Sequence, residues 1–234
     1  MGGTVVLVHG AHHGGWCWRR VARLLRDTGH EVFTPTLTGL GERAHLLTPE
    51  VGLATMTRDV TALLEAEELT DVLLVGHSFG ALPVLGAADR APDRVRRIVL
   101  LDGLVVAAGR RGFDALPDDV VVQRELDARR RGHGIAIPPP PPEAFGVTDP
   151  EDATWLARHL TAQPLRSYRE PLALDGPLGA GLPVTYVYCS APPYPVIASS
   201  HQVVKDMGWE WRDLPTGHDA MVTDPEGTVA ALLA

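Results

Sequence analysis

Short apolar runs, separated by intervals long enough to hold a helix, constrain the fold of this chain more than any other sequence feature. Runs such as "VLLV" and "IVLL" contain no polar residue, as in strands of a parallel sheet that is covered by helices on both faces. The last run, "WEWRDL", alternates instead and is typical of an edge strand. The predicted strands are Val5–Val8, Val32–Thr34, Val72–Val75, Ile98–Leu101, Val184–Tyr188 and residues 209–214.

The intervals between these runs contain apolar residues at helical spacing, which predicts helices over Cys17–Thr28, Thr55–Glu68 and Phe79–Arg90. The chain has 234 residues, of which 45% are hydrophobic, enough for one large core but too few for two. We therefore predict a single α/β domain over residues 1–234, with a mostly parallel sheet flanked by helices on both faces.

Residues 103–181 break the alternation of strand and helix. They contain two helix-like stretches, Val120–Arg131 and Pro150–Leu160, and five consecutive prolines at Pro138–Pro142. An insertion of this length without strands is typical of a lid, so we divide the domain into a core (1–102 and 182–234) and a helical lid (103–181). The proline run is interpreted as a stiff connector, with a ligand for a proline-recognition module as the alternative.

Charge and cysteine content argue against several functions. The chain has 21 Lys and Arg against 29 Asp and Glu, a net charge of −8, and its basic cluster Arg129–Arg131 is short. We expect neither nucleic acid nor a membrane as a partner. Cys17 and Cys189 fit no metal or redox spacing and are expected to be reduced thiols. With the first strand starting near Thr4 and no long apolar run, a soluble cytoplasmic protein is expected, and a homodimer is left open.

The stretch "LVGHSFGA" (74–81) predicts a nucleophilic serine. Gly76 and Gly80 flank Ser78 at both second neighbours, between a buried strand and a helix, as in a nucleophile elbow. The tight turn lifts the hydroxyl above the sheet, and the N-terminus of the following helix is directed at a developing oxyanion.

The partners of this serine follow from chain order. The general base of this architecture is a histidine after the last strand, which indicates His218 in "LPTGHDAM". Two backbone N–H groups are needed for an oxyanion hole, and the corresponding positions are Ala11 and Phe79. An apolar pocket is expected around them, with candidate substrate contacts at His12, Trp16, Phe79, Leu104, Trp155 and Met221.

The histidines of "HGAHHGGWCW" allow more than one interpretation. His12 and His13 line the pocket or merely fill the loop, and both alternatives stay open at this point. We expect no metal site there, because no carboxylate lies nearby in the sequence.

Four motifs in order, "VLVHGAHHGGWCW", "PTLTGLGERAHL", "LVGHSFGA" and "TGHDAM", cover nearly the whole chain. Together they resemble the α/β-hydrolase superfamily, and within it the branch of plant methylesterases, hydroxynitrile lyases and related bacterial esterases. The resemblance implies a cofactor-free enzyme with a Ser-His-Asp triad under a helical lid, acting on small, often aromatic esters.

The chain departs from this family at the acid. The relatives carry it just after the fifth strand, where this chain has "YCSAPPYPVIAS" (188–199) without a carboxylate. Asp102, at the end of the neighbouring strand, is the best substitute, because parallel strands bring their carboxyl ends to one edge. The alternative is that Asp102 only caps its strand. Three other acids rank below it: Asp206, Asp219 and Asp224.

A serine at the elbow favours hydrolysis of a carboxylic ester through an acyl-enzyme. Lyase chemistry is the nearest alternative, but the cyanohydrin-cleaving relatives have Thr and Lys where this chain has Gly10 and Asp219. A non-hydrolytic protein of the same fold, lyase-like, cyclase-like or a small-molecule binder, is a second alternative, supported only by the missing acid.

Overall fold

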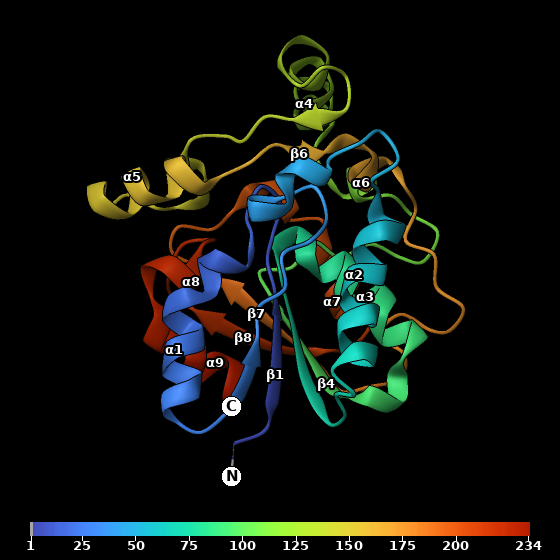
Figure 1. Ribbon diagram of the computed structural model, residues 1–234, viewed down its shortest axis with the longest axis vertical. Coiled ribbons are helices and arrows are strands. Elements are labelled where there is room, and N and C mark those ends of the chain that lie inside the picture. Colours follow the sequence, from blue (N-terminus) through green and yellow to red (C-terminus); the bar gives the residue numbers. More distant parts are fainter. Residues whose placement is uncertain (1) are drawn as a thin grey trace.

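A computed structural model describes residues 2–234 (Figure 1). Six strands form one sheet in the order β2-β1-β3-β4-β7-β8, and every neighbouring pair is parallel. The sequence prediction of a parallel sheet is confirmed, with the alternating strand β8 at an edge. The strands are β1 (Thr4–Val8), β2 (Glu31–Phe33), β3 (Val72–His77), β4 (Val95–Leu101), β7 (Val184–Cys189) and β8 (Glu210–Leu214).

Helices cover both faces of the sheet (Figure 1). One face carries α1 (Arg19–Asp27), α8 (Ala220–Thr223) and α9 (Pro225–Leu233), where α1 packs on α9. The other face carries α2 (Leu53–Ala66), α3 (Ala81–Arg90) and α7 (Ser200–Asp206), where α2 packs on α3. Short 3-10 helices occupy Gly15–Trp18, Gly41–Leu46, Ser78–Gly80, Pro92–Arg94, Gly112–Ala115, Pro142–Phe145 and Pro195–Ile197.

The two faces have separate hydrophobic cores, and β1 shows why its sequence run is uninterrupted. Val6 and Val8 belong to the core under α2 and α3, whereas Val5 and Leu7 belong to the core under α1 and α9. All four are at most 1% exposed. Burial of a side chain of this size contributes about 1.5–3 kcal/mol, so both faces of the strand stabilise the fold.

The insertion (103–181) crosses the carboxyl edge of the sheet, with α4 and α5 projecting beyond the core (Figure 1). It contains α4 (Asp118–Arg131), α5 (Pro150–His159) and α6 (Leu165–Arg169). The expectation that it lacks strands is wrong, because β5 (Ala136–Ile137) pairs antiparallel with β6 (Gln163–Pro164). Each of these strands has only two residues, and β6 includes a proline, so neither produces a recognisable strand pattern in the sequence.

Among residues 2–234, no helix combines the length and apolarity that a membrane span requires. Cys17 and Cys189 are free and buried.

Candidate active site

Ser78 lies on the turn that joins β3 to α3 at the carboxyl edge of the sheet. Its φ is +51°, in the left-handed region that a side-chain-bearing residue rarely adopts. Gly80 lies two residues later, and a Cβ atom at this position would be only 2.4 Å from the carbonyl oxygen of His9. The turn is therefore strained at the serine and too crowded two residues later for any side chain, as in a nucleophile elbow.

His218 lies on the loop after β8 and contacts two groups from other strands. Its Nε2 is 2.8 Å from Ser78 Oγ, and its Nδ1 is 2.6 Å from Asp102 Oδ2. His218 and Asp102 are 2% and 1% exposed. An ionised carboxylate accepts only, so it holds the proton on Nδ1 and leaves the Nε2 lone pair facing the serine hydroxyl.

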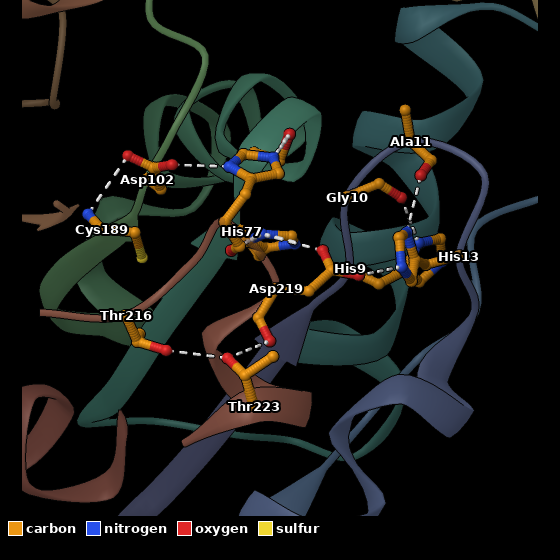
Figure 2. Close-up of polar contacts among 12 residues, drawn as sticks. His9, Gly10, Ala11, His13, His77, Asp102, Cys189, Thr216, Asp219 and Thr223 are labelled. Carbon is orange, nitrogen blue, oxygen red and sulfur yellow. Dashed lines mark hydrogen bonds and ion pairs between the residues drawn. The ribbon is translucent and has the colours of Figure 1, made fainter. Parts of the chain in front are cut away.

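Asp102 reaches this position because β4 and β7 are neighbours. It directly follows the last residue of β4 and has a φ of +43°, and its backbone N–H donates to the Val187 carbonyl at 2.7 Å. Its second carboxylate oxygen accepts the Cys189 N–H at 3.4 Å (Figure 2). The segment after β7, without an acid, instead places the Tyr194 ring on the His218 ring, with centroids 4.1 Å apart.

A second buried pair, His13 and Asp219, lies near this contact. His13 Nδ1 donates to the Ala11 carbonyl at 2.7 Å and Nε2 to Asp219 Oδ2 at 3.0 Å (Figure 2). Both ring nitrogens face acceptors, so the geometry favours the imidazolium form. Burial alone would lower the pKa of His13, but the Asp219 carboxylate outweighs it and raises that pKa. Burial likewise opposes ionisation of Asp219, and the charge of His13 brings its pKa below the ordinary value.

This pair gives Asp219 a partner far away in the sequence. No carboxylate lies close to His13 along the chain, and Asp219, 206 positions away, gives no sign in the sequence that it pairs with His13. The side chain of Asp219 is thus bonded to His13 and not to either ring nitrogen of His218.

His77 supports the backbone of the neighbouring His218. Its Nε2 donates to the His218 carbonyl at 3.0 Å, and its Nδ1 is buried without a partner. Burial, helped by His218 nearby, holds the pKa of His77 well below 6.5, so the ring is neutral. Ligand atoms of His77, His218 and Asp219 lie within 4.8 Å of one another, as a metal ion would require. Both nitrogens of His218 are already engaged by Asp102 and Ser78, so this cluster is better suited to proton transfer than to ligation.

The loop after β1 brings Ala11 to the serine. His9 fixes this loop, because its Nε2 accepts the Leu37 N–H at 3.0 Å and its Nδ1 donates to the Gly10 carbonyl at 2.8 Å. Within residues 2–234, the Ala11 N–H has no hydrogen-bond acceptor. Phe79 is the second residue of the 3-10 turn Ser78–Gly80, where backbone N–H groups lack intrahelical partners.

A cavity of about 860 Å³ lies between the insertion and this edge of the sheet. His12 and His218 are the members of the predicted site that line it, together with Arg124, Phe145, Tyr194 and the prolines Pro138–Pro141. Arg124 and Tyr194 are missing from the sequence prediction, because nothing in their local pattern separates them from ordinary surface residues.

The other predicted substrate contacts lie outside the walls of this cavity. Trp16 packs edge to face on Trp155, with ring centroids 5.1 Å apart. Leu104 donates its N–H to the Ser78 carbonyl at 2.8 Å. Phe79 and Met221 are fully buried. Contact of these residues with a substrate stays a prediction.

The model of the alpha/beta hydrolase family matches residues 5–232. This chain belongs to the alpha/beta hydrolase family. Among curated proteins, the carbendazim hydrolyzing esterase of Nocardioides sp. (strain SG-4G) is 40% identical, over 98% of each chain. Methyl jasmonate esterase 1 of Vitis vinifera is 34% identical over 54% of this chain and 46% of its own length.

Solved structures of the alpha/beta hydrolase fold superpose over nearly the whole chain. One is described as an extracellular alpha/beta-hydrolase from a Paenibacillus species, with structural and functional homology to Tobacco Salicylic Acid Binding Protein 2. It has a TM-score of 0.84 at 24% identity, covering 98% of this chain and 97% of its own. The methylesterase MES16 from Arabidopsis has a TM-score of 0.80 at 22% identity, covering 100% and 98%. At these identities the likeness establishes the fold.

Proposed function

We propose that this protein hydrolyses carboxylic esters through an acyl-enzyme, with Ser78 as nucleophile, His218 as general base and Asp102 as the acid that orients the base. The proposal depends above all on one observation, the continuous hydrogen-bonded line from Ser78 through His218 to Asp102, at 2.8 and 2.6 Å. Such a line keeps the imidazole in the tautomer that accepts the serine proton.

The expected reaction has two steps that share the same base. Ser78 Oγ attacks the ester carbonyl carbon while His218 Nε2 takes the serine proton. The resulting oxyanion accepts hydrogen bonds from the N–H groups of Ala11 and Phe79. The imidazolium then gives its proton to the leaving alcohol, and the acyl group remains on the serine. In the second step His218 removes a proton from water, which attacks the acyl-enzyme, and the imidazolium then returns this proton to Ser78 Oγ as the acid is released.

Small hydrophobic or aromatic esters are the proposed substrates. The cavity is lined by prolines and by the rings of Phe145 and Tyr194, which favour flat apolar groups. The relatives named as esterases support the same class. The insertion (103–181) supplies much of this wall, which supports the proposal that it acts as a lid.

The structure removes the only support for the non-hydrolytic alternative. It depended on a missing acid, whereas Asp102 lies within hydrogen-bond distance of His218. A cytoplasmic location and a homodimer stay predictions.

A fluorophosphonate probe and 4-nitrophenyl acetate test the proposed nucleophile directly. We expect Ser78→Ala to lose both labelling and hydrolysis while keeping its thermal unfolding temperature. The matched control is Ser199→Ala at an exposed serine, which should retain both. Labelling or full turnover in folded Ser78→Ala would contradict the assignment.

A further inference from the structure

Arg124 is a cation on the wall of the same cavity as His218. It lies on α4, in the insertion, and is partly buried. Its guanidinium carbon lies 4.9 Å from the centre of the Tyr168 ring. One of its terminal nitrogens, Nη1, is enclosed and has no hydrogen-bond partner. A buried N–H group without an acceptor is unfavourable, so this nitrogen would gain from an acceptor entering the cavity.

Arg124 differs in this respect from Arg129 and Arg131 of the same helix. Arg129 pairs with Glu125 at 3.7 Å, and Arg131 pairs with Asp127 at 2.8 Å. Across residues 2–234, no carboxylate lies within ion-pair distance of Arg124. Its charge is therefore balanced by no side chain of the described protein.

The polar groups around Arg124 do not supply a negative charge. The Tyr168 ring lies beside the guanidinium and Tyr194 lines the same cavity, where burial raises the pKa of Tyr194 to about 12, so its phenol keeps its proton. Burial, with Arg124 as a second cause, lowers the pKa of His12 to about 3, so His12 is neutral and adds no second cation.

The acidic side chains on the cavity wall are also unsuited to neutralise it. Asp119 and Glu143 are exposed to solvent, and Asp127 is bonded to Gln123 and Arg131. A cation that these groups leave unpaired, in a cavity partly shielded from water, is the usual environment for recognition of an anionic ligand group.

The position of Arg124 connects this cation with the reaction centre. Arg124, Tyr194 and His218 line the same cavity, and Tyr194 stacks on the His218 ring with centroids 4.1 Å apart. A small ligand in the cavity can therefore meet the base at one end and the guanidinium at the other.

We propose that Arg124 binds an ionised carboxylate of the substrate, so that the preferred substrates are esters carrying a second, free carboxylate group. The inference extends the proposed ester hydrolase function to a substrate class and depends on it.

Two esters with the same leaving group and acyl length test this preference. Mono-4-nitrophenyl glutarate carries the carboxylate, and 4-nitrophenyl methyl glutarate is its neutral counterpart. We expect wild-type kcat/KM to be about tenfold or more higher for the anionic ester, mainly through a lower KM. Arg124→Gln should remove this preference and leave the neutral ester within about threefold of wild type, whereas Arg124→Lys should keep part of it.

Arg131→Gln is the matched control, since Arg131 lines the same cavity but is paired with Asp127. It should leave the preference intact. Equal kcat/KM for the two esters in wild type would overturn the inference, and so would an equal loss for both in Arg124→Gln.

A binding measurement separates failure of this inference from failure of the ester hydrolase function. Ser78→Ala cannot turn over, yet we expect it to bind glutarate by calorimetry, about tenfold or more tighter than Ser78→Ala/Arg124→Gln does. Glutarate binding that is absent or unaffected by Arg124→Gln would overturn the anchor. Cleavage of neither ester by wild type, with glutarate binding intact, would contradict only the hydrolase function.

Discussion

Replacing Asp102 by Asn tests the proposed orientation of the base while changing only one oxygen to an amide nitrogen. The carboxylate now serves two donors, the His218 Nδ1–H at 2.6 Å and the Cys189 N–H at 3.4 Å. An asparagine side chain has only one acceptor oxygen, which cannot reach both the His218 Nδ1–H and the Cys189 N–H. The outcome depends on which donor receives that oxygen.

If the amide oxygen faces Cys189, the NH₂ group donates to His218 Nδ1 and the ring proton moves to Nε2, where it blocks acceptance of the serine proton. The same change in a serine protease lowers kcat about 10⁴-fold, or about 5.4 kcal/mol. If the oxygen faces His218, the useful tautomer survives and only the charge that stabilises the imidazolium is lost. A charged hydrogen bond is about 1–2 kcal/mol stronger than a neutral one, so this orientation predicts a loss of about five- to thirtyfold.

The expected result is therefore a fall in kcat of between about fivefold and 10⁴-fold for 4-nitrophenyl acetate, measured on protein whose circular dichroism and melting temperature show that it is folded. Asp206→Asn, at an exposed acid of α7, is the matched control and should be fully active. A loss below about fivefold in Asp102→Asn would refute the orienting role.

Three further predictions concern stability and thiol reactivity. Burial lowers the pKa of His9 from 6.5 to about 3, so below pH 6.5 the unfolded chain takes up a proton that the folded protein does not. The stability that the neutral His9 contributes is fully present above pH 6.5 and is lost as the pH falls to about 3. Between these pH values, His9→Gln should reduce the slope of the unfolding free energy against pH, measured with urea, by about 1.4 kcal/mol per pH unit. An unchanged slope would contradict the lowered pKa of His9. Gly80→Ala places a Cβ 2.4 Å from a backbone oxygen, so we expect a loss of roughly 1–3 kcal/mol or more in chemical unfolding, and wild-type stability would be inconsistent with the turn described here. Burial raises the thiol pKa of Cys17 and Cys189, so Ellman's reagent should react with neither in the native protein and with both after denaturation; rapid native reaction would disprove their enclosure.

Local sequence patterns were sufficient to predict those parts of the structure that depend on residues close together along the chain. The run at 72–75 predicted a buried strand, and β3 extends it by two residues to His77, the residue before the serine. The small residues at positions 76 and 80 predicted the turn, which depends on steric contacts within a few residues. The expected chain order, with the histidine after the last strand, indicated His218, and its Nε2 lies 2.8 Å from Ser78 Oγ.

Asp102 marks the limit of this reasoning. The sequence could propose it because parallel strands end at one edge, but its alternative role as a strand cap remained open. Only the pairing of β4 with β7 and the path of the loop after β8 bring its carboxylate to 2.6 Å from His218. The ion pair of His13 with Asp219 had no sequence signal, since its partners are 206 positions apart.

The sequence by itself determined the elements, their parallel arrangement and the strained serine turn, because period, side-chain size and backbone sterics act over a few residues. Only the tertiary structure decided which acid meets the base, which histidine is charged and which cation lines the cavity. Those outcomes depend on the distances and the low dielectric between segments far apart in the chain, and neither quantity is present in a linear pattern.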